Sequence, residues 1–320
     1  MKVLANDGIS ASGKAALEAN GHVLLETTVA QDQLAAFIQS ENIEVLLVRS
    51  ATKVRKDLID VCPSLKVIGR GGVGMDNIDV EYAREKGLKV INTPAASSQS
   101  VAELVFAHLA GMVRFLPDSN RNMPLEGDSK FKQLKKAYAG GVELKGRTLG
   151  IVGFGRIGQA LAKLAIGHGM DVCFYDMITG DVELDLELGN GASAKATVKW
   201  TEFEDLLKTS DFISLHVPGA GKALIGAEEM AKMKPGSGLL NAARGGVIDE
   251  PALLAALESG QIKYAGLDVF ENEPTPAVQV LMNGKVSLTP HIGAATEEAQ
   301  DRIGTELAEQ IHAISQEVTA

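Results

Sequence analysis

Short apolar runs alternate with longer helical patterns along almost the whole chain, and this alternation limits the possible folds more than any other feature. In the first third, five runs rich in Val, Leu and Ile are predicted to be strands, at residues 2–6, 22–26, 45–49, 65–69 and 88–92. Helical patterns are predicted between them at residues 13–19, 31–39 and 80–86. Parallel strands buried on both faces have this composition, so the pattern predicts a βαβ series and a doubly wound α/β domain.

A second series of the same kind follows a long, largely apolar helix predicted at residues 97–118. Its predicted strands cover residues 148–155, 171–176, 211–218, 236–244, 264–270 and 286–291. A last helix is predicted at residues 296–318. Because 320 residues suffice for two domains with sizeable cores, we expect two doubly wound α/β domains.

The composition argues against several classes of protein. A net charge of −10 argues against nucleic acid as a partner. No apolar run approaches the roughly 18 residues of a transmembrane helix, and the N-terminus lacks the apolar segment of a signal peptide. Cys62 and Cys173 lie far apart in apolar surroundings and are expected to be free thiols. We therefore expect a cytoplasmic protein that binds small molecules, without a membrane or a metal.

The stretch "GIVGFGRIG" has the features of a dinucleotide-binding turn. Gly153, Gly155 and Gly158 form a G-x-G-x-x-G motif between an apolar strand and a helical run. In such a motif the first glycine allows the tight turn, the second lets the backbone approach a pyrophosphate, and the third lets helix and strand pack closely. The next predicted strand ends at Asp176, where a carboxylate binds the adenosine ribose and repels a 2′-phosphate. NAD is therefore predicted in preference to NADP.

Polar residues that suit acid–base chemistry follow the later strands of the second series. Arg244, Asp268, Glu273 and His291 all come at or just after predicted strand ends, the edge where open α/β sheets bind ligands. An arginine can grip a carboxylate with two parallel hydrogen bonds. A histidine can pass the proton that accompanies hydride transfer, and a neighbouring carboxylate stabilises its charged form. Together these residues predict a catalytic site.

Arg49 raises a separate question, because it comes directly after the apolar run of Leu46, Leu47 and Val48. A cation at the end of a buried strand is costly unless it meets an anion. The alternative to an anion-binding role is a structural one, in which the arginine forms a salt bridge at the rim of the sheet.

The chain resembles the D-isomer-specific 2-hydroxyacid dehydrogenases over nearly its whole length. The resemblance rests on "GRTLGIVGFGRIG" (146–158), "NAARGGVIDE" (241–250), "GLDVFENEP" (266–274) and "PHIGAAT" (290–296), in that order. It implies that Arg244 binds the substrate's carboxylate and carbonyl, that His291 is the acid/base with Glu273 as its partner, and that Asp268 lies near the nicotinamide amide.

The resemblance also implies the domains and the remaining binding residues. A flavodoxin-like substrate domain is expected at 1–96 plus 293–320, with a Rossmann NAD-binding domain inserted at 97–292 and the active site in the cleft between them. The implied cofactor-binding residues are Val73, Gly153, Gly155, Arg156, Ile157, Gly158, Asp176, His216, Val217, Pro218, Ala242, Asp268, Gly293 and Ala294. The implied substrate-binding residues are Arg49, Arg70, Gly72, Val73 and Gly74.

Two further stretches, "VRSATKV" and "KVIGRGGVGMDNIDVEYAREKGLKVINTP", look like the phosphoglycerate dehydrogenase branch of that family. This likeness implies that Arg49, with Arg70, clamps the phosphate of 3-phosphoglycerate, whose charge suits arginine geometry. The expected reaction is its NAD-dependent oxidation to 3-phosphohydroxypyruvate, in serine synthesis, and the expected assembly is a homodimer. The alternatives are the same chemistry on 2-hydroxyglutarate, glyoxylate or D-lactate, or a non-catalytic NAD-sensing protein similar to a corepressor.

The chain departs from that branch in four places. Val73 stands where threonine is usual, "PAASSQS" replaces a segment richer in glycine and asparagine, and the loop "HVPGAGKALIG" is short. At these three places the local contacts are expected to differ from those usual in the branch. The chain ends at Ala320 without room for an appended regulatory domain, so feedback by serine through such a domain is not expected.

Overall fold

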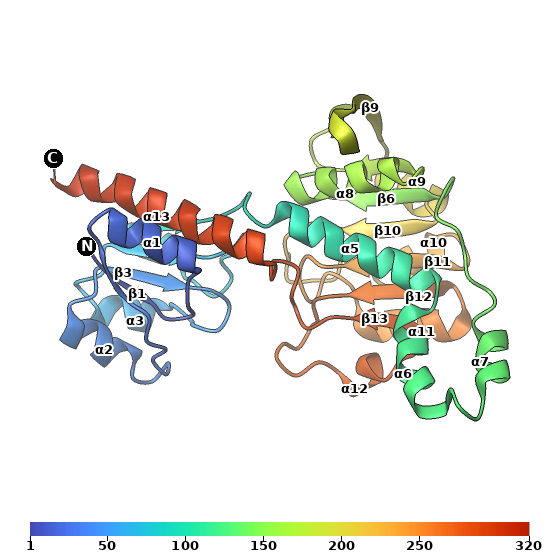
Figure 1. Ribbon diagram of the computed structural model, residues 1–320, viewed down its shortest axis with the longest axis horizontal. Helices are drawn as coiled ribbons and strands as arrows, with labels where there is room; N and C mark the ends of the chain where they lie inside the picture. Colours follow the sequence, from blue (N-terminus) through green and yellow to red (C-terminus); the bar gives the residue numbers. More distant parts are fainter. Residues whose placement is uncertain (320) are drawn as a thin grey trace. The chain divides into compact units, whose positions relative to one another are not determined.

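The structure is a computed structural model that describes residues 1–319, and it divides into two compact units (Figure 1). The N-terminal unit comprises residues 1–100 together with the chain from residue 294 onward, and the Rossmann unit comprises residues 101–293. The functional domain limits given above remain a prediction, and the last residue they include, Ala320, lies outside the described residues.

The N-terminal unit is built on a five-stranded sheet in which every neighbouring pair is parallel. Its strands, in the spatial order β2-β1-β3-β4-β5, follow the flavodoxin-like order. The strands are β1 (Lys2–Ala5), β2 (Val23–Leu25), β3 (Val45–Val48), β4 (Val67–Arg70) and β5 (Lys89–Asn92). All five were predicted, because their Val, Leu and Ile residues form the layer between two cores.

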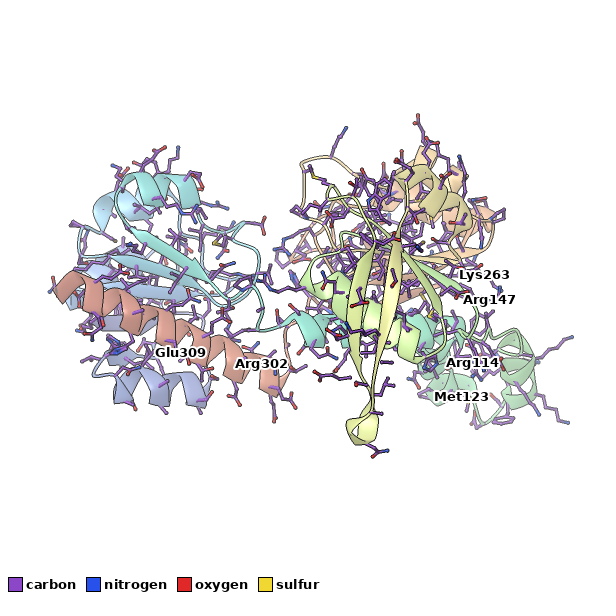
Figure 2. The ribbon with its side chains drawn as sticks, turned by 90° about the horizontal axis from the view of Figure 1, so that it is seen from above. Arg114, Met123, Arg147, Lys263, Arg302 and Glu309 are labelled. Carbon is purple, nitrogen blue, oxygen red and sulfur yellow. The ribbon has the colours of Figure 1, made fainter. Side chains whose placement is uncertain are left out.

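Helices cover both faces of this sheet. They are α1 (Ala11–Ala19), α2 (Leu34–Glu41), α3 (Lys56–Val61), α4 (Val80–Glu85) and α13 (Glu297–Thr319), of which α3 was not predicted. Ile303, Leu307 and Ile311 of α13 pack into the same core as residues of β1 and β3. α1 and α13 cross closely, because a Cβ added to Gly13 would lie only 2.6 Å from the Cα of Gly304. Arg302, labelled on α13 in Figure 2, donates from Nε to the carbonyl of Ala96 at 2.9 Å.

The Rossmann unit contains an eight-stranded sheet with the order β13-β12-β11-β10-β6-β7-β9-β8. Its strands are β6 (Thr148–Val152), β7 (Asp171–Tyr175), β8 (Val182–Glu187), β9 (Ser193–Trp200), β10 (Phe212–Leu215), β11 (Ser237–Asn241), β12 (Ile262–Leu267) and β13 (Val286–Leu288). Only the β8–β9 pair is antiparallel. β10 lies beside β6 on the side opposite β7, so the strand order reverses at β6, as in a dinucleotide-binding sheet.

The helices of the Rossmann unit lie on both faces of this sheet (Figure 1). They are α5 (Ser98–Val113), α6 (Leu116–Glu126), α7 (Phe131–Ala137), α8 (Arg156–Gly167), α9 (Phe203–Thr209), α10 (Ala227–Lys232), α11 (Glu250–Ser259) and α12 (Val278–Leu281). Within residues 1–319, no single helix is long and apolar enough to cross a membrane, and α5 and α6 pass that test only when joined across a 58° bend.

Two predictions for the Rossmann unit were wrong in detail. The helix predicted at 97–118 ends at Val113, because Phe115 adopts a left-handed backbone conformation (φ 57°) and starts a new helix direction. The segment between Asp176 and the strand β10 was not predicted to contain strands. The structure places the β8–β9 hairpin there, with a single turn of 3₁₀ helix (Gly189–Gly191) at its tip.

Candidate active site

The turn from β6 into α8 has the geometry that a pyrophosphate requires. Gly153 has φ 91°, and an added Cβ would lie 2.5 Å from the carbonyl oxygen of His216. A Cβ on Gly158 would lie 2.4 Å from the oxygen of Gly153, so the third glycine permits close packing. Gly155, the N-cap of α8, has no atom within 4 Å of an added Cβ, which leaves its backbone open to a ligand. The helix N-terminus beside it favours an anion.

Asp176 follows β7 and directs its carboxylate at this turn. Its Oδ2 accepts a hydrogen bond from the backbone N–H of Phe154 at 2.6 Å, and its Oδ1 accepts one from the N–H of Ile178 at 3.3 Å. Phe154 stands between the first two glycines of the motif. The predicted ribose-binding carboxylate and the glycine-rich turn are therefore held together by a direct contact.

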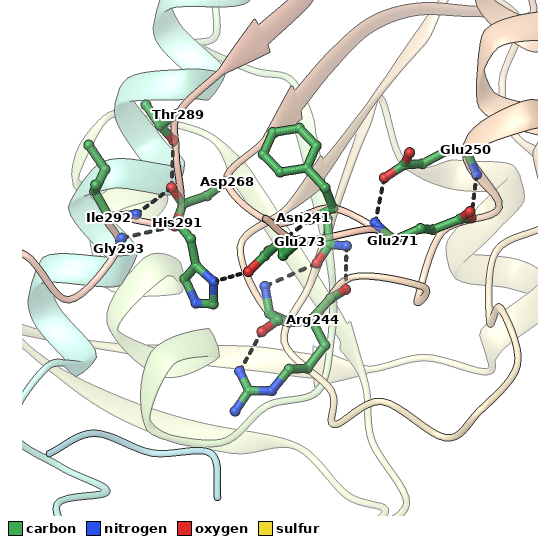
Figure 3. Close-up of polar contacts among 12 residues, drawn as sticks. Asn241, Arg244, Glu250, Asp268, Glu271, Glu273, Thr289, His291, Ile292 and Gly293 are labelled. Carbon is green, nitrogen blue, oxygen red and sulfur yellow. Dashed lines mark hydrogen bonds and ion pairs between the residues drawn. The ribbon is translucent and has the colours of Figure 1, made fainter. Parts of the chain in front are cut away.

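His291 and Glu273 meet although 18 residues separate them. His291 Nδ1 lies 2.8 Å from Glu273 Oε2, and the other carboxylate oxygen accepts the N–H of Phe270 at 3.0 Å (Figure 3). The His291 backbone is left-handed (φ 55°), a strained conformation that surrounding contacts must maintain. The side chain is 41% exposed, and among the described residues its Nε2 makes no hydrogen bond. This arrangement orients the imidazole and leaves Nε2 for proton transfer.

Arg244 follows β11 on a loop that Asn241 braces from within. The Asn241 side chain donates to the carbonyl of Arg244 at 2.8 Å and accepts the N–H of Ala243 at 3.0 Å. The Arg244 Nη1 donates to the carbonyl of Ala243 at 2.6 Å. The guanidinium is therefore presented by a folded loop and not by a flexible side chain alone.

Asp268 holds the loop that carries His291. This carboxylate is 1% exposed and accepts hydrogen bonds from Thr289 Oγ1 at 2.6 Å and from the N–H groups of Ile292 and Gly293 at 2.8 Å each (Figure 3). Sequence reasoning did not identify this role. The expected position of Asp268 near the nicotinamide amide remains a prediction.

His108 extends this network and was also missed. It lies on α5, and its ring nitrogens are 2.7 Å from Ser287 Oγ and 2.8 Å from Thr289 Oγ1. Burial lowers the pKa of His108, which the negative charge of Asp268 partly opposes. A histidine inside the apolar stretch "VFAHLAG" was the available signal, but its partners lie about 180 residues away in the sequence.

The other predicted cofactor residues of this unit also follow strand ends. Arg156 and Ile157 begin α8, and Ala242 follows β11. His216 is followed by Val217 and Pro218 after β10. His216 Nε2 lies 2.8 Å from Ser214 Oγ, and burial lowers the pKa of His216 to about 4.

In the N-terminal unit, Arg49 has a fixed backbone and an unpaired side chain. Its N–H donates to Asp7 Oδ2 at 2.6 Å, and its carbonyl accepts from Asn77 Nδ2 at 2.8 Å. Within residues 1–319 its half-buried guanidinium makes no hydrogen bond and no ion pair. Burial lowers the pKa of Arg49, and Asp7 partly opposes this. Among these described residues, Arg49 therefore has no partner for the salt bridge at the rim that was the alternative.

Arg70 stands beside Arg49 in the fold, because β3 and β4 are paired with Val48 opposite Arg70. The following glycine-rich loop folds around its guanidinium, since a Cβ on Gly72 would lie 1.9 Å from Arg70 Nη1. The carbonyl of Val73 accepts from Asn92 Nδ2 at 2.8 Å, which anchors the loop before Gly74. Ala294, the last predicted cofactor residue, belongs to this unit, and its carbonyl accepts from Gln300 Nε2 at 2.7 Å.

Residues 106–293, more than half of the chain, match the family model described as "D-isomer specific 2-hydroxyacid dehydrogenase, NAD binding domain". The chain belongs to the D-isomer-specific 2-hydroxyacid dehydrogenase family. The Rossmann unit is thus the NAD-binding domain of this family, and the open backbone at Gly155 with Asp176 beside it fits that cofactor.

Relatives and solved structures of this dehydrogenase family extend the likeness to the whole chain. A hydroxypyruvate reductase of Thermotoga maritima is 44% identical over 88% of this chain and 87% of its own. A D-3-phosphoglycerate dehydrogenase of Methanocaldococcus jannaschii is 42% identical over 97% of this chain, which spans only 57% of that relative's length. The D-lactate dehydrogenase of Aquifex aeolicus, solved with NAD and lactic acid, superposes with a TM-score of 0.76 at 29% identity, covering 99% and 96% of the two chains.

Proposed function

We propose that this chain oxidises 3-phospho-D-glycerate to 3-phosphohydroxypyruvate with NAD, as the entry step of serine synthesis in the cytoplasm. The observation that carries the choice of substrate is the unpaired, half-buried guanidinium of Arg49. A buried cation without a partner is costly, so a ligand anion is expected to complete the site. A phosphate with nearly two negative charges meets that need better than a neutral group does.

The geometry of the Rossmann unit supports the proposed catalytic roles. Glu273 holds His291 through Nδ1, so Nε2 is the atom that accepts the proton of the C2 hydroxyl. Arg244 binds the carboxylate and the C2 oxygen, which orients C2 for transfer. NAD, when bound, accepts the hydride from C2. As the carbonyl forms, Glu273 stabilises the positive charge that develops on His291.

Other acids remain alternatives for the same chemistry. The name of the Thermotoga maritima relative, a hydroxypyruvate reductase, makes hydroxypyruvate one such alternative. Its reduction uses the same hydride and proton transfers in the opposite direction. Glyoxylate, D-lactate and 2-hydroxyglutarate would also need Arg244 and His291. A non-catalytic NAD-sensing protein would have no need of the aligned Glu273–His291 pair.

The deciding experiment is a panel of 2-hydroxy acids with NAD, followed by the absorbance of NADH. We expect 3-phospho-D-glycerate to have the highest kcat/KM, with D-glycerate far below it. A higher kcat/KM for an unphosphorylated acid would contradict the substrate proposal while leaving the dehydrogenase chemistry intact. No turnover with any acid, together with NADH binding, would favour the NAD-sensing alternative.

We also propose a homodimer, supported by the exposed apolar side chains of α6 and α7. Neither helix has a buried residue, and Leu125 and Phe131 are 76% and 57% exposed. Exposed apolar patches of this kind mark association surfaces. Light scattering on the purified protein should give twice the mass of one chain, and Leu125→Glu with Phe131→Glu should yield monomers. A monomeric wild-type protein would contradict this proposal.

A further inference from the structure

The β8–β9 hairpin follows a turn that begins at Asp176, the residue predicted to bind the adenosine ribose. This turn runs to Asp181, and Trp200, at the end of β9, holds both of its ends. The indole Nε1 donates to the carbonyl oxygen of Asp176 at 3.1 Å. The backbone N–H of Trp200 donates to Asp181 Oδ1, also at 3.1 Å. One residue therefore fixes the first and the last position of the turn.

The hairpin, whose yellow tip projects outward in Figure 2, is joined to the sheet by the end of β9. β8 and β9 pair along six facing positions, and Leu184, Leu186 and Val198 are buried in the Rossmann core. The end of β9 joins β7 in parallel, with Trp200 opposite Phe174. Trp200 is thus paired with β7, the strand that precedes Asp176. This pairing fixes the position of the indole that bonds to the turn.

The contacts of Asp176 explain why its main chain must be fixed. The two carboxylate oxygens accept hydrogen bonds from Phe154 in the glycine-rich turn and from Ile178 within the turn itself. The direction of the carboxylate therefore depends on the main chain of residues 176–178. Trp200 holds the start of this segment through the carbonyl of Asp176.

The one lysine beside Trp200 is paired with a carboxylate of the same turn. Lys199, next to Trp200, pairs with Asp181 at 2.7 Å, and the residues between Asp176 and Asp181 include no basic side chain. Lys199 and the N–H of Trp200 together hold the pKa of Asp181 below its usual range. The turn therefore presents a directed carboxylate without a free positive charge.

We propose that Trp200 is a positioning residue for cofactor choice, which keeps the Asp176 carboxylate on the glycine-rich turn and so favours NAD over NADP. This inference rests on the proposed role of Asp176 in binding the ribose. A carboxylate in this place accepts hydrogen bonds from the ribose hydroxyls of NAD and repels the 2′-phosphate of NADP. Without the hydrogen bond from Trp200, the carboxylate can rotate away from the glycine-rich turn. Both the binding of the ribose and the repulsion of the 2′-phosphate then weaken.

The test compares Trp200→Phe with Trp200→His by calorimetric titration of the purified protein with NADH and with NADPH. The imidazole of His keeps an N–H at the ring position of the indole Nε1, whereas Phe has none. We expect Trp200→Phe to weaken NADH binding roughly three- to tenfold, the value of one neutral hydrogen bond, and to bind NADPH no more weakly. Trp200→His should retain more of the preference for NADH. Lys195→Ala, which breaks the exposed pair with Glu183 on the same hairpin, is the matched control and should change neither affinity.

Equal losses in the Phe and His variants, or an unchanged NADH-to-NADPH ratio in both, would overturn the proposal, because the effect would then come from lost packing. If the Trp200 variants do not fold, Asp181→Ala releases the other end of the turn, and an unchanged ratio there would overturn it equally. Wild-type protein that binds NADH and NADPH alike would instead reject the proposed role of Asp176. The substrate proposal is independent of all these outcomes, since no 2-hydroxy acid takes part in the titrations.

Discussion

Charged residues predicted for the site are held differently in the two units of this dehydrogenase. In the Rossmann unit, Asp176, Asp268 and Glu273 each accept hydrogen bonds from the protein itself. In the N-terminal unit, Arg49 has a fixed backbone but a guanidinium without a partner. Proton and hydride transfer require groups that are oriented before the substrate arrives, whereas recognition of an anion requires a charge that the protein leaves unsatisfied. The difference separates the unit proposed to perform the chemistry from the unit proposed to select the substrate.

The largest expected effect tests the chemical half of this comparison. His291→Ala should lower kcat by roughly 10²–10⁴, because general acid–base catalysis contributes about that much. NADH binding should change little, since the glycine-rich turn is independent of His291. Steady-state kinetics and NADH titration measure the two quantities separately. A variant with near-full turnover would place the acid/base elsewhere and end the distinction between the units.

The next effect tests the recognition half. Arg49→Ala should weaken the binding of 3-phospho-D-glycerate by roughly 3 kcal/mol, about a hundredfold, because the phosphate loses a charge-assisted hydrogen-bond partner. The loss should appear mainly in KM, since the phosphate is remote from C2 and is bound alike in ground and transition states.

D-glycerate and Arg49→Lys are the matched controls for this prediction. D-glycerate has no phosphate, so its poor kcat/KM should scarcely change in Arg49→Ala. Arg49→Lys keeps the charge without the bidentate geometry and should fall between the wild type and the alanine variant. An equal fractional loss on both acids would show that Arg49 is structural.

A smaller effect sharpens the comparison through pH. The pKa of His216 is about 4 in the folded protein and roughly 6.5 in an unfolded chain, so the unfolded chain binds more protons between these values. Its contribution to stability is present above pH 6.5 and is lost as the pH falls towards 4. From pH 7 to pH 5 the Rossmann unit should lose about 2 kcal/mol from this residue.

Urea unfolding followed by the fluorescence of Trp200 measures this loss, because the chain's single tryptophan lies in the Rossmann unit. His216→Gln should reduce the pH dependence by that amount, whatever its stability at pH 7. The same pH dependence in wild type and variant would remove His216 as its source.

The smallest expected effect concerns the network beneath His291. Thr289→Val removes the hydroxyl that joins His108 to Asp268, and it should lower the free energy of unfolding by roughly 1–2 kcal/mol. The loop that carries His291 is also hydrogen-bonded to Asp268. We therefore expect kcat to fall several-fold while KM for NAD stays nearly constant. Thr305→Val is a suitable control, since that hydroxyl bonds only to carbonyls within the exposed side of α13. A fall in stability without any fall in kcat would confine the network to a structural role.

Strands and site residues differed in how far the sequence could predict them. The two cores impose runs of Val, Leu and Ile, so the buried strands from β1 to β13 were predicted, apart from the hairpin. The β8–β9 hairpin was missed although "VELDLE" alternates strictly, because a two-sided amphipathic strand at a sheet edge lacks the apolar run that marked the others. The pairing of His291 with Glu273 was predicted from motifs. The contact of His108 with Thr289 depends on how α5 lies against β13, and no local pattern encodes that.

The N-terminal unit is built from two segments of the chain that are separated by the whole Rossmann unit, so its two parts are synthesised at different times. α13 completes a core whose other residues come from β1, β3 and neighbouring segments, yet the ribosome makes it only after residues 101–293. At roughly 5–20 residues per second, the first unit waits on the order of 10–40 s with one face of its sheet covered only in part, by α1. Val3, Val45 and Leu47 lie on that face. During that interval part of this apolar surface is exposed to solvent, so we expect the nascent chain to be more prone to aggregation than the finished protein.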